Sequence, residues 1–153
     1  MKKIISILII LISLNTYAQD EEQEIKELQF NYLSFLKSEG YVGSIDEDGD
    51  IKFKFEGDTY YIWPSTSNYF TLKRYLTNND EGCSNKIKAI VEATNGRYKA
   101  TSVGILGENC NLIRIKIESL LANPEDYKLI FDRCINIIRA QRELISDENE
   151  KYQ

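Results

Sequence analysis

The chain has 153 residues, and its 24 acidic and 19 basic side chains give a formal net charge of −5 at pH 7. DNA and anionic lipid repel an acidic protein at long range, so we expect no nucleic-acid partner. The sequence contains no histidine, which removes the usual general base of serine and cysteine hydrolases and leaves a zinc site short of ligands.

The first eighteen residues have the three parts of a secretory signal peptide. Lys2 and Lys3 give a positive start, residues 4–14 are almost all apolar, and Ala18 ends a short polar stretch. The apolar run is too short for a bilayer core, which needs roughly twenty residues. We therefore expect cleavage close to Ala18 and a periplasmic or secreted product with no stable membrane anchor. Loss of the two lysines would change the net charge to about −7.

An amphipathic helix is expected over residues 20–39, because apolar side chains recur there every three or four positions and Gly40 can end it. Three segments of strand composition follow, at residues 51–55, 59–63 and 69–76. Short runs of turn residues separate them, which predicts a three-stranded antiparallel meander.

A second helix is expected to begin at Ser84 or Asn85, and the Asn95-Gly96 pair can end it. Residues 99–106 and 112–120 have the alternation of strands and are joined by a turn, so they predict a hairpin. A long last helix should follow the cap and first-turn proline at Asn123-Pro124.

The predicted element order is therefore α-β-β-β-α-β-β-α. Antiparallel strands with one apolar face, and helices to cover it, predict a two-layer α+β domain. We expect one such domain over residues 20–145, because a chain of this length can bury a single core. The polar residues 146–153 should form a flexible tail.

With this element order, the chain resembles the YbjN family of bacterial sensory transduction regulators, whose fold is like that of type III secretion chaperones. The likeness extends over residues 28–140 and lies in residues 48–55 (DGDIKFKF), residues 57–62 (GDTYYI) and the helix end at residues 91–95. It implies a small interaction module, often dimeric, with no catalytic residues and no cofactor. A secretion chaperone works in the cytoplasm, however, whereas this chain begins with an export signal.

Residues 46–50 (DEDGD) have the closely spaced carboxylates of a calcium loop. The register argues against one. If Gly49 took the sixth position of an EF-hand loop, Ser44 would stand at the first position and Phe55 at the twelfth, where Asp and Glu are needed. The prediction is a tight acidic turn that leads into a strand, with no metal site.

The cysteines are Cys83, Cys110 and Cys134. Cys83 precedes the second predicted helix, and Cys110 lies in the turn of the last hairpin. If that helix runs antiparallel to the strand after it, both residues lie at one end of the domain, and we predict a Cys83–Cys110 disulfide. The bond would close a loop of about 27 residues and contribute about 3 kcal/mol. Cys134 lies on an apolar helix stripe and should be buried. Three free thiols are the alternative.

The strands also predict a basic surface. If their apolar residues face the helices, the opposite face carries Tyr75 together with the basic side chains Lys52, Lys54, Lys73, Arg114 and Lys116. Such a face within an acidic protein would suit an acidic peptide or a glycan. The alternative is a solvated face, because lysine on the wet side of a sheet is common and discourages edge pairing.

These observations favour an exported, non-enzymatic module that binds a protein partner, either alone or as a homodimer. Two alternatives remain: a small-ligand or glycan binder with a pocket among Tyr60, Tyr61, Trp63 and Tyr69, and a hydrolase built on carboxylates. The sequence has no Gly-x-Ser-x-Gly motif and no phosphate-binding loop. A deep pocket with converging polar groups would favour an alternative, and a broad face without one would favour the module.

Overall fold

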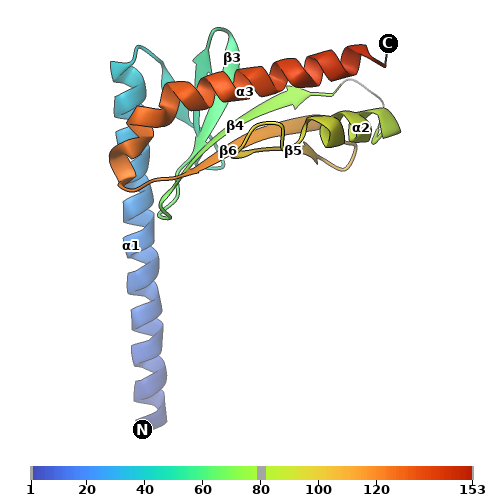
Figure 1. Cartoon of the computed structure of the whole chain (residues 1–153). Helices are drawn as coiled ribbons and strands as arrows, with labels where there is room; N and C mark the ends of the chain where they lie inside the picture. The colour runs from blue at the N-terminus through green and yellow to red at the C-terminus, as the bar shows by residue number, and fades with distance from the viewer. Residues whose placement is uncertain (1, 79–81, 153) are drawn as a thin grey trace.

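The computed structural model describes the backbone of residues 2–78 and 82–152, and side chains from Asp20 onward. Figure 1 shows an α+β fold, as the sequence predicts. In chain order the elements are α1 (Lys2–Ser38), β1 (Gly43–Ile45), β2 (Ile51–Phe55), β3 (Asp58–Trp63), β4 (Tyr69–Thr77), α2 (Asn85–Thr94), β5 (Thr101–Leu106), β6 (Leu112–Leu120), the 3-10 turn η1 (Pro124–Asp126) and α3 (Tyr127–Glu150).

The described strands form one antiparallel sheet in the order β1-β2-β3-β4-β6-β5. The predicted meander is confirmed as β2-β3-β4, and the predicted hairpin as β5-β6. The sheet has one further strand, β1, which is three residues long and pairs with β2 at the edge. A run of this length carries too little alternation to be found from sequence.

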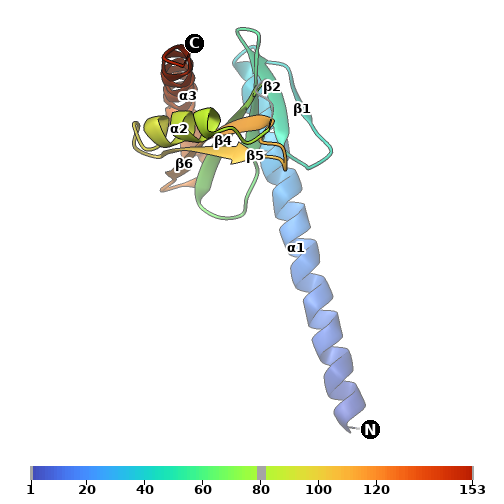
Figure 2. The same ribbon diagram turned by 90° about the vertical axis from the view of Figure 1, so that its right-hand side faces the viewer.

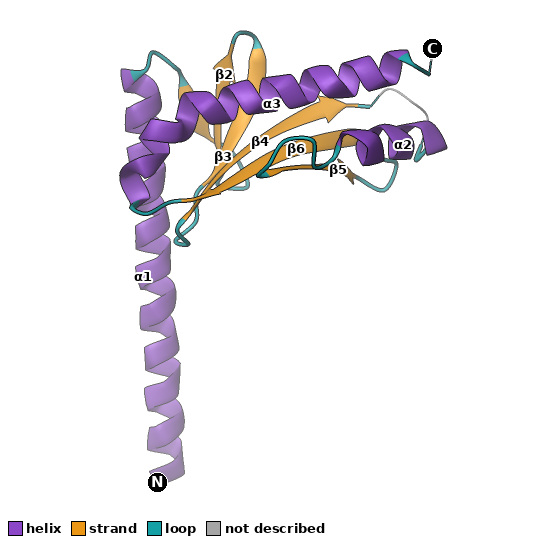
Figure 3. Cartoon of the chain, in the orientation of Figure 1, coloured by secondary structure: helices purple, strands orange, loops and turns teal. Residues whose placement is uncertain are grey.

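The helices form a single layer on one face of the sheet, where α3 lies across the strands (Figure 3). Each helix contributes fully or almost fully buried side chains, such as Leu36 from α1, Ile90 from α2 and Phe131 from α3. They pack against the inward residues of the strands, among them Phe53, Leu72 and Ile115. The domain therefore has two layers, one of helices and one of strands, with a single hydrophobic core between them.

Helix α1 is longer than the sequence predicts, because it continues from Ser38 back to Lys2 instead of beginning near residue 20. Residues 2–39 contain neither Gly nor Pro, so nothing in the sequence stops the helix. Figures 1 and 2 show its N-terminal part projecting away from the domain. Within the described part of the chain, no helix is long and apolar enough to cross a membrane.

Helix α3 also differs from the prediction, since it extends to Glu150 and includes most of the segment expected to be a flexible tail. Ile145, just before this segment, is buried at 6% exposure and anchors the helix to the core. The segment has no helix breaker, and Lys151 forms an i, i+3 ion pair of 2.6 Å with Glu148. The polar end of the chain is therefore helical.

The start of α2 follows the predicted capping chemistry. Ser84 is the N-cap, and its hydroxyl oxygen accepts a hydrogen bond of 3.2 Å from the amide of Ile87. Helix α2 ends at Thr94, where Gln141 of α3 donates its side-chain amide to the Thr94 carbonyl at 2.9 Å. This contact ties the last turn of α2 to α3.

Candidate binding face

The strand register brings the predicted basic residues together on the sheet face opposite the helices. One row crosses the sheet from Ser44 through Lys52, Tyr61, Lys73 and Lys116 to Ser102. We call this surface the open face and define it by the outward side chains of the strands: Lys52, Lys54, Tyr61, Trp63, Thr71, Lys73, Tyr75, Arg114, Lys116 and Glu118. All six side chains proposed from the sequence for partner binding lie on it.

Two of the lysines on the open face are neutralised within the domain. Lys73 lies 3.0 Å from Asp50, and both side chains are mostly buried, at 14% and 12% exposure. Lys116 lies 2.9 Å from Glu118. The ammonium of Lys73 also lies 5.1 Å from the ring centre of Trp63, which holds it further in place. These pairs leave Lys73 and Lys116 less available to a partner than the sequence suggests.

The positive charge available on the open face comes from Lys52, Lys54 and Arg114. Lys52 and Lys54 are exposed and Arg114 is half-buried. Within the described part of the chain, none of these three side chains forms an ion pair with a nitrogen–oxygen distance of 4.0 Å or less. They can therefore meet an external acidic group without first breaking an internal pair.

Arg114 lies beside Tyr75 of β4 and Gly104 of β5 in the sheet register. A Cβ placed on Gly104 would meet nothing within 4 Å, so the face is open beside the arginine. The Nε of Arg114 is buried and has no hydrogen-bond partner within the described chain. A guanidinium that has no internal ion pair and has free space beside it is suited to a carboxylate.

Aromatic side chains complete the open face. The rings of Tyr61 and Tyr75 meet edge to face, with centroids 5.2 Å apart, and Trp63 is 47% exposed. Burial, and next the nearby Asp50 carboxylate, raise the pKa of Tyr75, while Arg114 opposes this shift. The Tyr75 hydroxyl is therefore protonated at neutral pH and can donate a hydrogen bond.

The sequence analysis missed a buried arginine on the helix side of the sheet. Arg74 is 4% exposed, its Nη2 lies 2.6 Å from an oxygen of Asp58, and its guanidinium lies 5.6 Å from the ring centre of Tyr60. The signal was present, because Arg74 continues the inward alternation of Phe70 and Leu72. Its charge is paired with Asp58, a partly exposed residue at the start of β3, so Arg74 serves the fold and not the open face.

The aromatic pocket suggested as an alternative does not form. Tyr60 is fully buried on the helix side, whereas Tyr61 lies on the open face, because consecutive strand residues point to opposite sides. Trp63 and Tyr69 are each 47% exposed. The four aromatic side chains predicted to line one pocket are therefore divided between two faces.

The structure contains a cavity of about 420 Å³ between β4, α2 and α3. Its polar lining includes Arg74, Arg142 and Asn149, and no Asp or Glu is among the described residues that line it. The lining of this cavity therefore does not support the alternative of a carboxylate hydrolase, which needs two converging acidic side chains.

The acidic residues 46–50 form the tight turn predicted from the sequence. The carboxylate of Asp46 accepts hydrogen bonds from the amides of Asp48 at 3.1 Å and Asp50 at 2.9 Å. Gly49 has φ +83°, and its carbonyl accepts a bond of 2.9 Å from Gln29 of α1. Across the described residues, no group of three or more Cys, Asp or Glu side chains is arranged to hold a metal ion.

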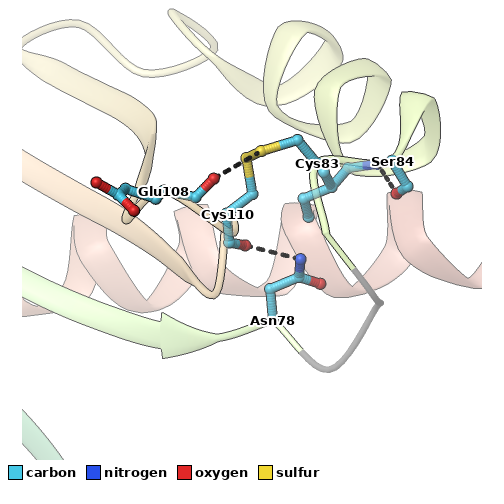
Figure 4. Close-up of a disulfide and its surroundings, with 6 residues drawn as sticks. Asn78, Cys83, Ser84, Glu108 and Cys110 are labelled. Atoms are coloured by element: carbon cyan, nitrogen blue, oxygen red, sulfur yellow. Dashed lines mark hydrogen bonds between the residues drawn. A yellow bond between two sulfur atoms is a disulfide. The ribbon is translucent and has the colours of Figure 1, made fainter.

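Cys83 and Cys110 form a disulfide, with their Cα atoms 5.0 Å apart (Figure 4). This is the pairing predicted from the sequence, and it joins the segment before α2 to the turn between β5 and β6. The side-chain amide of Asn78, after β4, donates to the Cys110 carbonyl at 2.8 Å (Figure 4). Cys134 is 2% exposed in the core, and burial raises the pKa of its thiol.

Comparisons with known proteins give a fold and no function. No protein-family model and no curated protein matches this sequence. Among solved structures, the chain is similar to an uncharacterized protein from Methanothermobacter thermautotrophicus, with a TM-score of 0.52 and 15% sequence identity. The match covers 82% of this chain and 99% of that protein. At this identity, the likeness is one of fold alone.

Proposed function

We propose that the protein is an exported, non-enzymatic interaction module of the YbjN type, and that its open face binds an acidic segment of a protein partner. The observation that carries the proposal is a broad sheet face that bears Lys52, Lys54 and Arg114, none of which has an ion-pair partner in the described chain. Because these charges are not paired within the protein, they are available to an acidic group of a partner.

The charge of the whole protein does not prevent this binding. The net charge is −5 for the full chain and about −7 after loss of Lys2 and Lys3, yet charges on other surfaces act on a partner mainly through solvent. At physiological salt the Debye length is about 8 Å, so a bound acidic segment is influenced chiefly by the face it touches. The open face therefore attracts acidic groups locally, while the overall negative charge disfavours nonspecific association.

The aromatic side chains supply contact area and direction. Trp63 and Tyr75 lie among the basic residues of the open face, and aromatic residues and arginine are enriched at the energetic centres of interfaces. Arg114 can hold a carboxylate through two parallel hydrogen bonds, with the protonated Tyr75 hydroxyl as a further donor nearby. The proposed binding mode is thus a carboxylate anchored at Arg114 and apolar contacts around it.

The Cys83–Cys110 bond supports export, because disulfides persist in oxidising compartments such as the periplasm and the extracellular space. The signal-peptide pattern at the N-terminus points to the same compartments. We therefore propose that the partner is met after export.

Site-specific photo-crosslinking in the cells that make the protein tests the proposal. A photoreactive residue replaces Trp63 on the open face, and in a parallel strain it replaces Asp132, an exposed residue of α3. We expect an adduct with an acidic protein from position 63 and none from position 132. Equal adducts from the two positions, or none from position 63, would contradict the proposal.

Charge reversal provides the matched control. The open-face variant carries Lys52→Glu, Lys54→Glu and Arg114→Glu, and it should lose the adduct from position 63. The control variant carries three reversals at exposed basic residues of the helices: Lys37→Glu, Lys88→Glu and Arg142→Glu. It has the same net charge and should keep the adduct. Loss of the adduct in both variants would show a general charge effect and remove the open face from the argument.

A further inference from the structure

A further candidate site lies on the helix side of the sheet, in the cavity of about 420 Å³ between β4, α2 and α3. We call it the α2–α3 cavity. Its walls are largely aliphatic, and five buried or half-buried side chains supply them: Leu76, Ile87, Ile90, Ile113 and Ile145. Sites for small molecules have volumes of roughly 300–1,000 Å³ and mostly apolar linings. The cavity can therefore enclose the apolar part of a small ligand.

The polar side chains of the α2–α3 cavity change from basic to neutral along its length. Strand β4 and helix α3 run in the same direction (Figure 1). Along β4 the lining passes from Arg74 to Asn78, and along α3 it passes from Arg142 to Asn149. The aliphatic side chains lie between these ends. One end of the cavity is therefore cationic, and the other end is polar without charge.

A hydrogen bond of Gln141 aligns the two arginines. The hydroxyl of Thr101 donates to the side-chain oxygen of Gln141 at 3.4 Å, and Thr101 shares a row of the sheet with Leu72. Arg142 is the next residue of α3 after Gln141. Arg74 is the next inward residue of β4 after Leu72. The two arginines therefore line the same end of the cavity.

The domain does not fully neutralise the positive charge at this end. Arg142 is exposed, which places it at the mouth, and within the described part of the chain it forms no ion pair of 4.0 Å or less. Arg74 lies deeper, at 4% exposure, and is paired with Asp58. The described lining contains two guanidinium groups and no carboxylate. An anion at the mouth would be attracted by Arg142 and would meet no acidic side chain of the described lining.

The lining favours an aliphatic ligand over an aromatic or sugar ring. Tyr75 is the one aromatic residue among the described residues of the lining, and its side chain lies on the open face, on the other side of the sheet. The described lining therefore offers no ring that could stack on a nucleobase or a sugar. An alkyl chain instead packs well against branched aliphatic side chains.

The wall formed by α2 is held at both of its ends. The Cys83–Cys110 disulfide ties the segment before α2 to the turn between β5 and β6. At the other end of α2, the Thr94 carbonyl accepts the side-chain amide of Gln141 at 2.9 Å. The side chains of α2 that line the cavity lie between these two ties. The wall is thus in place before a ligand arrives, which lowers the cost of binding.

We propose that the α2–α3 cavity binds a small aliphatic monocarboxylate, with its carboxylate at Arg142 beside Arg74 and its alkyl chain among the aliphatic side chains. Arg142 and Asn149 are seven positions apart in α3 and therefore about 10 Å apart along its axis. An alkyl chain of medium length, such as that of decanoate, fits this span. Because Asn78 and Asn149 make the far end polar, a longer chain should gain little from its additional methylenes.

Isothermal titration calorimetry of the exported, disulfide-bonded protein with decanoate tests the proposal. We expect saturable binding at one site per chain. The affinity should rise about 4-fold for each methylene added from hexanoate to decanoate, because each methylene buries apolar surface. Decyltrimethylammonium, a cation with an alkyl chain of the same length, should not compete. Absence of saturable binding, equal affinity for hexanoate and decanoate, or competition by the cation would overturn the proposal.

Substitutions at the mouth then locate the site. Arg142→Gln should lower the affinity for decanoate about 10-fold or more, since it removes a hydrogen bond between charged groups. Ser146→Trp should also lower the affinity, because the indole would fill the mouth that Ser146 lines. Both positions are exposed, so the circular dichroism spectrum and the melting temperature should not change. Arg133→Gln makes the same change at an exposed position of α3 outside the cavity, and should leave binding intact. Wild-type affinity in either mouth variant, or an equal loss in Arg133→Gln, would reject the site.

The open-face variant with Lys52→Glu, Lys54→Glu and Arg114→Glu separates this site from the proposed partner-binding surface. It should bind decanoate with wild-type affinity, because the open face and the cavity lie on opposite sides of the sheet. Loss of decanoate binding in this variant, with Arg142→Gln unaffected, would assign the ligand to the open face and overturn the proposal. A failure to bind decanoate would leave the photo-crosslinking result at position 63, and with it the proposed function, unchanged.

Discussion

Replacement of both Cys83 and Cys110 by alanine should lower the stability of the domain by several kcal/mol. The disulfide links two residues that are 27 positions apart in the chain. In the chain-entropy description, a cross-link that closes a loop of this length stabilises the folded state by about 3.5 kcal/mol, because it restricts the unfolded chain. A small domain is stable by only about 5–15 kcal/mol in total, so the loss would be a large fraction.

The expected effect on melting is correspondingly large. A domain of about 130 residues has an unfolding entropy near 0.28 kcal/mol/K, so a loss of about 3.5 kcal/mol should lower the melting temperature by about 10–14 °C. Urea unfolding should show the same loss in the free energy of unfolding. The slope against urea concentration should rise slightly, since the unfolded chain without its cross-link exposes more surface.

Circular dichroism with and without a phosphine reductant separates the bond from the side chains. Reductant should lower the melting temperature of the wild-type protein to that of the double-alanine variant and leave the variant unchanged. Cys134→Ala provides the control, because it removes the buried thiol and should leave the response to reductant intact. A loss below about 1 kcal/mol on reduction would refute the entropy argument.

Three further substitutions test the packing. Arg74→Met keeps the side-chain volume but removes the partner of Asp58, and it should cost about 1–3 kcal/mol in urea unfolding; an unchanged midpoint would mean that the 2.6 Å pair contributes nothing net. Gly43→Ala should cost about 1–3 kcal/mol, since the new Cβ would lie 2.9 Å from a methyl group of Leu33; a neutral effect would show that this leucine moves aside freely. Burial raises the pKa of Tyr32 to about 12, above an unfolded value near 10, so its contribution is complete below pH 10 and is lost as the pH rises through 12. Tyr32→Phe should therefore flatten the fall in stability between pH 10 and 12, and an identical fall in the variant would contradict the assignment.

Much of the open face could be predicted because alternation is a local property. In a strand, successive side chains point to opposite sides, so the positions of Lys52 and Lys54 on one face follow from their spacing alone. The same rule places Tyr60 and Tyr61 on opposite faces of the sheet. The predicted aromatic pocket was wrong because it required both side chains on one face. The rule also places Arg74 inward, where its charge made a buried position unexpected.

Ion pairing on the open face could not be predicted. Asp50 lies 23 positions before Lys73, and the two meet because β4 is held beside β3 and β3 beside β2 in one register. A shift of one residue in either pairing would separate them. The sequence shows which lysines share a face of the sheet, but it does not show which of them already have an acidic neighbour.

The amino-acid sequence by itself determined the main helices and strands, the alternation of inward and outward side chains along the longer strands, and the turn at residues 46–50. It also led to the pairing of Cys83 with Cys110, on the condition that α2 runs antiparallel to the strand after it. The elements and the turn depend on backbone periodicity and turn residues, which act over a few positions, whereas the cysteine pairing rests on the order of the elements along the chain. The tertiary structure decided that β6 lies between β4 and β5, and which lysines of the open face are neutralised by an acidic neighbour. Such features depend on distances of a few ångströms between segments far apart in the chain, and those distances exist only once the core has packed.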